Sequence, residues 1–310
     1  MTNVMDLPKS SSPFPANAPA RETARDYSTR RSFSYGGFIY WVALLLLSCA
    51  MLMPLIFMIN TSFKGTAETY NDPPTFWPAK IEWANFRDAF TRFPFARYLG
   101  NTLLLTSLRV SGTLISCTLV AWGFARYPAR WSRGLFMICL ATMMLPPQVT
   151  SIPVFTMYVK LGLYDTYVPL VLGSWLAQSA FYIFLLRQFF QGIPEDLLNA
   201  ARIDGCGEFG TLWRIALPLS KPILWTVAVF TFLHAWNDYF GPLIYLVDER
   251  KYPVSLGLTY FVSASKDATF GTQWNLMMAV SMLTMIPVAI LFFLAQRSFV
   301  NNAMSGGLKA

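Results

Sequence analysis

A small set of polar residues lies inside long apolar runs of this sequence, where a polar side chain needs a specific reason. Arg109 is the one charged residue deep within a run, and Gln148 and the sequence Trp236-Asn237-Asp238 are the other polar groups at comparable depth. Because a charge in an apolar medium is costly, Arg109 is expected to face the interior of a helix bundle. Amides and aromatic rings suit hydrogen bonds to hydroxyls and stacking on C–H faces, so this set indicates a path for a polar solute.

Each of these residues also has a purely structural interpretation. Arg109 could pair with a carbonyl group or with a carboxylate such as that of Asp238, and not touch a substrate. Gln148 and Asn237 could form the hydrogen bonds between helices that polar residues commonly make in membranes. The sequence leaves both interpretations open.

Residues suited to covalent or metal chemistry are scarce. The chain has one histidine, His234, and four cysteines without the spacing of metal or disulfide sites. We interpret His234 as a packed helix residue and the cysteines as small hydrophobic residues. The sequence also lacks a Gly-x-x-x-x-Gly-Lys-Ser/Thr loop, which would cradle the phosphates of ATP. We therefore expect no metal, cofactor or ATP site in this chain.

The composition predicts an all-α integral membrane protein. The 310-residue chain is 55% hydrophobic and 13% charged, whereas a soluble domain carries about 25% charged residues. The net charge of +8 does not indicate nucleic acid, because Lys and Arg are dispersed among the loops between apolar runs. Attraction to the anionic cytoplasmic leaflet explains this charge better.

Six apolar runs are long enough to cross a bilayer, which takes about 20 residues. They cover residues 38–59, 101–124, 134–158, 167–186, 224–246 and 276–294. The third run contains Pro146, Pro147 and Pro153, which predict a kink or a local unwinding. Within a membrane, such irregular backbone is tolerated only beside protein or a water-filled path.

The distribution of basic residues predicts the orientation. Lys and Arg number 14 in the tails and loops on one side of these runs and nine on the other side. The positive-inside rule therefore places both termini and residues 187–222 in the cytoplasm. The long loop 60–100, which contains Trp77 and Trp83, then lies outside, either on the membrane surface or against an external partner.

Three regions follow from this arrangement. Residues 1–36 are rich in Ser, Pro and Arg and are expected to form a disordered cytoplasmic tail. Residues 37–297 form the six-helix transmembrane domain, and residues 298–310 form a cytoplasmic C-terminal tail.

The polar segment 193–222 is read as a helix, a glycine break and a second helix. Pro194 suits the first helical position, and Gly205 lies where the chain must leave the first helix, at a positive φ. The second helix is expected from about residue 208 to 217, until Pro218 and Pro222 stop it.

The first of these helices is too short to form a domain by itself. It carries Leu197, Leu198 and Ile203, so it needs a groove in which to lie. The small Ala200-Ala201 pair permits close approach to such a groove.

The segment resembles the cytoplasmic loop of permease subunits of bacterial ABC importers. The family pattern is Glu-Ala-Ala, three residues, Gly, and about nine residues later Ile-x-Leu-Pro. The matching residues are Ala200, Ala201, Asp204, Gly205, Ile215, Leu217 and Pro218. Asn199 stands where the family usually has Glu; it still forms hydrogen bonds but lacks the charge that a salt bridge would need.

Further segments are similar to the carbohydrate-importer branch, and to its second permeases of the maltose and glycerol-phosphate type. They are Leu145-Pro-Pro-Gln-Val-Thr150, Lys160-Leu-Gly-Leu163, Leu185-Leu-Arg-Gln-Phe-Phe190, Ala235-Trp-Asn-Asp238, Gly241-Pro-Leu-Ile-Tyr-Leu246, Ala295-Gln-Arg-Ser-Phe-Val300 and Ser305-Gly-Gly-Leu-Lys-Ala310. Together the resemblance covers about residues 38–310.

The resemblance implies a type I ABC importer permease fold in the bacterial inner membrane, without catalytic activity of its own. The implied partners are a second permease in a heterodimer, two ATPase subunits that bind ATP and Mg, an extracytoplasmic sugar-binding protein and the sugar. The residues implied to contact the ATPase are Asn199, Ala200, Ala201, Asp204, Gly205 and Pro218. Residues 306–309 resemble an ending that reaches the ATPase dimer in some members, with a frayed terminus as the alternative.

Two other classes of protein remain as alternatives. An ATP-independent secondary transporter of a small polar solute predicts a buried acid or histidine relay, and such residues are scarce here. A membrane-embedded enzyme needs a cluster of His, Asp or Glu, and one histidine is too few.

Overall fold

The computed structural model describes residues 35–91, 93–127, 129–264, 266–267 and 271–307. The predicted disordered tail therefore lies almost entirely outside the described residues, as do residues 308–310. The chain forms two compact units, Met1–Leu52 and Met53–Ala310.

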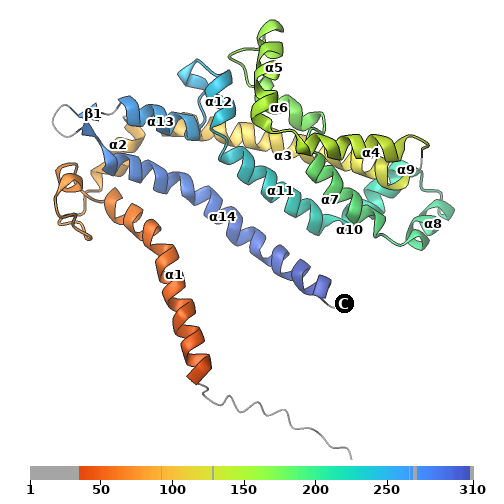
Figure 1. Ribbon diagram of the computed structural model, residues 1–310, viewed down its shortest axis with the longest axis horizontal. Helices are drawn as coiled ribbons and strands as arrows, with labels where there is room; N and C mark the ends of the chain where they lie inside the picture. The colour runs from red at the N-terminus through yellow and green to blue at the C-terminus, as the bar shows by residue number, and fades with distance from the viewer. Residues whose placement is uncertain (1–34, 92, 128, 265, 268–270, 308–310) are drawn as a thin grey trace, which may run out of the picture. The chain divides into compact units, whose positions relative to one another are not determined.

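Almost all regular elements are helical (Figure 1). In chain order they are α1 (Tyr35–Ser62), η1 (Ala67–Tyr70), α2 (Ala84–Thr91), α3 (Phe95–Arg126), α4 (Ser132–Ala141), η2 (Thr142–Met144), α5 (Pro147–Lys160), α6 (Val168–Trp175), α7 (Ala180–Gln191), α8 (Glu195–Ile203), α9 (Glu208–Thr211), η3 (Leu212–Ala216), α10 (Leu217–Leu219), α11 (Lys221–Trp236), α12 (Phe240–Tyr245), η4 (Glu249–Lys251), α13 (Val254–Ala264), β1 (Lys266–Asp267), β2 (Gly271–Thr272) and α14 (Trp274–Gly307). The two short strands pair antiparallel.

The first unit contributes the amino-terminal part of α1. The described side chains of this part are apolar and mostly exposed, among them Trp41, Leu45 and Met51. A helix that is hydrophobic on all sides requires lipid or another protein around it.

The second unit is built around α3, which packs against α6, α7 and α11 (Figure 1). One core cluster joins the carboxyl end of α3 to α7, α8 and α11, with Trp122, Phe190 and Leu198 among its buried members. A second cluster joins α2 and the start of α3 to α13 and α14 through residues such as Phe93 and Val280. The first cluster attaches the polar 193–222 segment to the bundle.

The all-α membrane architecture is confirmed by helix length and composition. Four helical stretches are long and apolar enough to cross a membrane; they are Phe38–Ser62, Phe95–Arg126, Val168–Gln191 and Trp274–Gln296. The number of candidate spans in the described residues rises to six when each of two bent helix pairs is taken as one span.

The predicted kink in the third run is present. Ser132–Met144 and Pro147–Lys160 meet at 101°, and the chain at Pro146 between them is extended. Pro153 lies inside α5 and does not end it.

The predicted fifth span was wrong in its bounds. The run 224–246 is not one helix, because α11 ends at Trp236 and α12 begins at Phe240. Side chains cap this break: Asn237 Nδ2 donates to the Leu233 carbonyl at 2.9 Å, and Asp238 Oδ1 accepts from the Gly241 amide at 3.1 Å. The bent pair that can form a fifth span instead joins Glu208–Leu219 to Lys221–Trp236 at 78°.

The loop 60–100 is ordered by a buried amide network. Asn85 Nδ2 donates to the carbonyls of Ser62 and Lys64 at 2.9 and 2.8 Å, and Asn275 Nδ2 donates to Asn85 Oδ1 at 2.9 Å. Trp77 and Trp83 remain largely exposed. Contact of this loop with the membrane surface or an external partner stays a prediction.

Candidate functional site

The turn at Gly205 ends α8 as the sequence predicted. Gly205 has φ +82°, the left-handed conformation that favours glycine. Its amide donates to the Arg202 carbonyl at 3.0 Å, and the Cys206 amide donates to the Ala201 carbonyl at 2.9 Å. These two bonds form a Schellman motif, which satisfies the last carbonyls of the helix and reverses the chain.

Helix α8 has two apolar faces with different surroundings. Leu198 and Ala201 are each 3% exposed, and Leu198 belongs to the core cluster that holds α8 on the bundle. Leu197 lies on the solvent side, and Ile203 is 87% exposed. The small pair is therefore split: Ala201 faces the core, whereas Ala200 is exposed.

Asn199 takes part in a polar bridge across the Gly205 turn. Its Oδ1 accepts a hydrogen bond from Arg202 Nη1 at 3.1 Å, and Arg202 Nη2 lies 3.2 Å from Glu208 Oε1. The pKa of the Tyr127 phenol is raised, first by burial and then by its hydrogen bond to Glu208. This hydrogen bond connects the end of α3 to the start of α9. Asp204 is exposed at the C-cap of α8.

The second helix ends at Leu219, two residues beyond the predicted bound and between Pro218 and Pro222. Helix α9 continues through the π-helical turn η3 into α10, which ends at Leu219. The wider π-helical turn frees carbonyls just before Pro218, so the missing N–H of the proline costs little there. Ser220 marks the break, and its buried hydroxyl donates to the Ala216 carbonyl at 2.6 Å.

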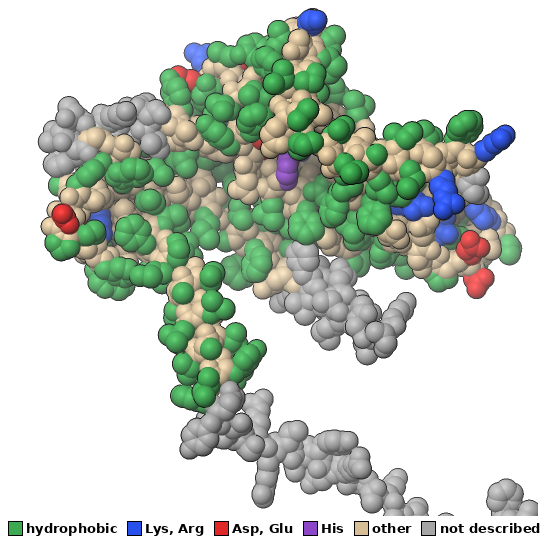
Figure 2. Space-filling view, viewed as in Figure 1, with side chains coloured by type: hydrophobic (Ala, Val, Ile, Leu, Met, Phe, Trp, Pro, Cys, Tyr) green, Lys and Arg blue, Asp and Glu red, His purple; other side chains and the backbone are tan. Residues whose placement is uncertain are grey.

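Arg126 fixes the start of the segment. Its Nη2 donates to the carbonyls of Phe190 and Ile193, the latter at 2.9 Å. Figure 2 shows Lys and Arg side chains gathered at the end of the second unit that carries α4, α8 and α9, while hydrophobic side chains cover much of the remaining visible face. This segregation suits a segment held at the polar boundary of an apolar bundle.

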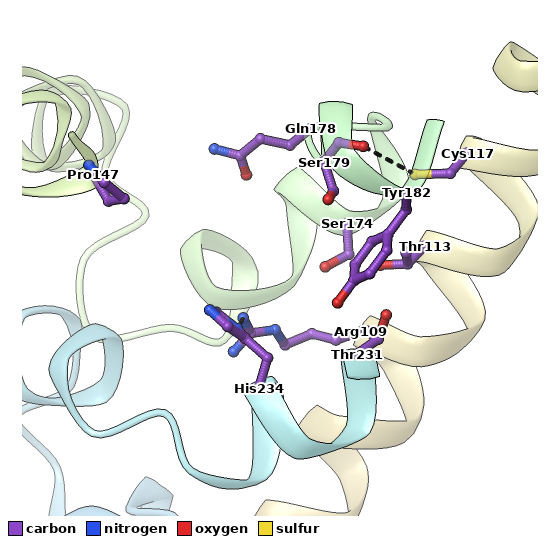
Figure 3. A pocket seen from close by; sticks show the side chains of 10 residues that line it. All are labelled: Arg109, Thr113, Cys117, Pro147, Ser174, Gln178, Ser179, Tyr182, Thr231 and His234. Atoms are coloured by element: carbon purple, nitrogen blue, oxygen red, sulfur yellow. Dashed lines mark hydrogen bonds between the residues drawn. The ribbon is translucent and has the colours of Figure 1, made fainter. Parts of the chain in front are cut away.

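A cavity of about 390 Å³ lies between α3, α11 and the α6–α7 break. Its lining residues are Arg109, Thr113, Cys117, Pro147, Ser174, Gln178, Ser179, Tyr182, Thr231 and His234. Figure 3 shows Ser174, Gln178, Ser179 and Tyr182 on the α6–α7 side, across from Arg109 and His234. Most of these groups are hydroxyls or amides, which both donate and accept hydrogen bonds.

Arg109 has the carboxylate partner that its structural interpretation named. Its Nη1 lies 2.6 Å from Asp238 Oδ2, with the two side chains 16% and 18% exposed. Its Nη2 lies 3.3 Å from His234 Nδ1. We expected His234 to be a packed helix residue. It lies in α11, but its side chain is exposed in the cavity.

The other residues of the predicted path do not line this cavity. Gln148 is exposed next to Pro147, which does line it. Trp236 is buried and stacks on Phe232 with ring centroids 5.2 Å apart. Asn237 caps the end of α11, and Asp238 acts through Arg109.

The sequence analysis missed the residues at the α6–α7 break. Ala177 has φ +53°, an uncommon value for a residue with a Cβ, and it turns the chain between the two helices. Gln178 follows, and its backbone N–H donates to the Gly173 carbonyl at 3.1 Å. The available signal was the polar pairs Gly173-Ser174 and Gln178-Ser179, which interrupt the fourth apolar run.

Across the described residues, no three His, Cys, Asp or Glu side chains lie close enough to hold a metal ion. The arrangement supports hydrogen bonding to a polar solute and contact with another protein.

Comparison with known proteins defines the class. The family model for the binding-protein-dependent transport system inner membrane component matches residues 117–303, more than half of the chain. The chain belongs to this family and is a permease subunit of an ABC importer.

Relatives match over nearly the whole length. The probable ABC transporter permease protein YurM of Bacillus subtilis is 32% identical over 282 residues, which cover 90% of this chain and 91% of that protein. The arabinooligosaccharides transport system permease protein AraQ of Halalkalibacterium halodurans is 30% identical, with 83% and 90% covered. The sn-glycerol-3-phosphate transport system permease protein UgpE of Yersinia pestis is 32% identical, with 81% and 90% covered.

A solved structure confirms the fold. A chain from the crystal structure of a bacterial ABC transporter involved in the import of the acidic polysaccharide alginate superposes with a TM-score of 0.77 and 25% identity. The alignment covers 86% of this chain and 98% of that chain. The predicted type I importer permease fold is thereby confirmed.

Proposed function

We propose that this permease forms half of the path for a carbohydrate or polyol and couples it to separate ATPase subunits through residues 195–219. A second permease, two ATPase subunits and an extracytoplasmic binding protein complete the importer. The names of the relatives, which include arabinooligosaccharide and glycerol-phosphate permeases, support this substrate class.

The proposed ATPase contact is supported by the different surroundings of the two faces of α8. Its inner face is fixed to the bundle through Leu198 and Ala201, while Leu197 and Ile203 present apolar surface outward. An exposed apolar ridge on an otherwise polar segment indicates a protein partner. Because the segment is anchored to α3 and α7, a movement of the partner would be transmitted to those helices.

The roles of individual residues follow from their positions. Ala200, Asn199 and Asp204 lie on the exposed side and are proposed to contact the ATPase. Gly205 and Ala201 set the turn and the anchor, and Pro218 lies at the exposed end of the segment. The chain itself contributes no ATP hydrolysis in this proposal.

The proposed orientation places both termini and α8 in the cytoplasm, as the distribution of Lys and Arg favours. The loop 60–100 then faces outward, toward the binding protein or the membrane surface. An ATP-independent secondary transporter would have no use for an ATPase contact at α8.

Photocrosslinking tests this proposal directly. A photoreactive residue at Ile203, which is 87% exposed, should crosslink to the ATPase subunit in the assembled importer. The same residue at Trp83, which is 68% exposed in the loop 60–100, is the matched control and should give no ATPase crosslink. A crosslink from Trp83 and none from Ile203 would refute both the contact and the orientation.

A further inference from the structure

The charge of Arg109 is already compensated inside the protein. The Arg109 Nη1 to Asp238 Oδ2 distance of 2.6 Å and the low exposure of both side chains make this a close, largely buried ion pair. Among the residues that line the cavity, Arg109 is the only Lys, Arg, Asp or Glu. An anion that enters the cavity therefore meets a guanidinium already paired with a carboxylate.

His234 lies beside this pair, with its Nδ1 3.3 Å from Arg109 Nη2. A guanidinium has only donors, so a hydrogen bond between these two side chains uses the imidazole nitrogen as the acceptor. The Arg109–Asp238 pair itself carries one charge of each sign.

The opposite wall offers neutral groups only. Gln178 contributes an amide, Ser174 and Ser179 contribute hydroxyls, and Tyr182 contributes a phenol and an aromatic face (Figure 3). The Gln178 side chain lies over Gly173, where a Cβ would lie 1.9 Å from its Oε1. Such a wall can exchange hydrogen bonds with several hydroxyls and stack on a ring.

We infer that this cavity admits neutral polyhydroxylated solutes and discriminates against anionic ones. The inference rests on the proposed function, with this cavity taken as part of the translocation path. A buried negative charge needs a positive partner, and here the charge of Arg109 is already balanced by Asp238. The cavity then favours uncharged sugars and polyols over sugar phosphates and uronates.

A thiol introduced by Ser174→Cys makes the inference testable without transport, because Ser174 lines the cavity and is partly exposed, whereas native Cys117 is only 1% exposed. In the importer complex with Cys49, Cys117, Cys139 and Cys206 replaced by Ser, the introduced thiol is modified by neutral hydroxyethyl or by anionic sulfonatoethyl methanethiosulfonate. The ratio of the anionic to the neutral rate is compared with the same ratio for mercaptoethanol in solution. The relative rate cancels the intrinsic reactivity of the thiol.

With the Arg109–Asp238 pair intact, the anionic reagent should be disfavoured by on the order of tenfold relative to free mercaptoethanol. Asp238→Asn leaves Arg109 uncompensated, and its amide oxygen can still accept from the Gly241 amide. This variant should raise the ratio by on the order of tenfold. Equal ratios for the thiol introduced at position 174 and mercaptoethanol, or a ratio unchanged by Asp238→Asn, would overturn the inference.

A second variant covers the case in which Asp238→Asn fails to assemble. Gln178→Lys adds a positive charge to the opposite wall while the ion pair stays intact, and Gln178→Leu is its uncharged control. The lysine variant should raise the ratio and the leucine variant should not; equal ratios in both would overturn the inference. A missing ATPase crosslink at Ile203 with these results intact would refute the proposed coupling and leave the charge selectivity standing.

Discussion

Gly112 of α3 lies directly against the indole ring of Trp175 at the end of α6. A Cβ at position 112 would lie 2.6 Å from Trp175 Cδ1, well inside van der Waals contact. This close approach brings α3 next to the α6–α7 break, and so brings Arg109 and Thr113 to the same cavity as Ser174 and Gln178.

Gly112→Ala should therefore lower stability by about 1–3 kcal/mol, because the added methyl group overpacks the α3–α6 contact. Gly100→Ala in the same helix is the matched control, since a Cβ there meets nothing within 4 Å. Alanine is the better helix former, so the control should be neutral or gain up to about 1 kcal/mol. Thermal unfolding of the purified complex measures both, and equal melting temperatures for the two variants would contradict the close approach.

The Arg109–Asp238 pair predicts strong non-additivity. Arg109→Gln leaves the Asp238 carboxylate without its partner at 18% exposure and should cost about 3–5 kcal/mol. Arg109→Gln combined with Asp238→Asn removes both charges and should recover much of that loss. A double-mutant cycle on unfolding free energies measures the coupling, and simple additivity of the two single changes would show that the pair contributes little.

Gly205 should be needed for coupling and not for insertion. Gly205→Val places a β-branched residue at φ +82°, which strains the turn although no neighbouring atom lies within 4 Å. Substrate-stimulated ATP hydrolysis by the importer should fall, while the amount of the chain in the membrane stays unchanged.

The matched control for that change is Gly207→Val. Gly207 has φ −68° and equally open surroundings, so valine fits its backbone without strain. Equal stimulation of ATP hydrolysis in the two variants would show that the left-handed turn is not required for coupling.

Asp165 joins the loop after α5 to the segment after α12, outside the membrane-spanning segments. Its carboxylate lies 2.6 Å from Lys251 Nζ and accepts the amides of Val247 and Asp248 at 2.9 and 3.1 Å. The hydrogen bond from Lys251, followed by those from the two amides, lowers the pKa of the Asp165 carboxyl from 3.8 to about 2.

A lowered folded-state pKa stabilises the protein at any pH above the unfolded value, and this contribution is lost as the pH falls from about 4 toward 2. Asp165→Asn keeps the side-chain shape, and Asn tolerates the local φ of +54°. Between roughly pH 5 and pH 8, which lies above both pKa values, the melting temperature of this variant should lie below that of the wild type by a nearly constant margin. The margin should narrow below about pH 4, and a margin that grows there would contradict the assignment.

The coupling segment was largely predictable because its signals are local. A glycine at a helix end dictates a left-handed turn whatever surrounds it, and Gly205 behaves accordingly. The exact end of the second helix was not predictable, because the tolerance of Pro218 depends on the π-helical turn before it, which no single residue type announces. Length and hydropathy likewise predicted the membrane class, since about 20 apolar residues suffice to cross a bilayer in any tertiary context.

The cavity was decided by tertiary structure. Arg109 stood out by itself, but Gln178 at the α6–α7 break and His234 of α11 line the same cavity only because α3 packs against α6, α7 and α11. The sequence alone determined that the chain is a helical membrane protein with a left-handed turn at Gly205. Tertiary packing decided that Arg109 pairs with Asp238, because an ion pair depends on where two distant side chains meet and not on either residue by itself.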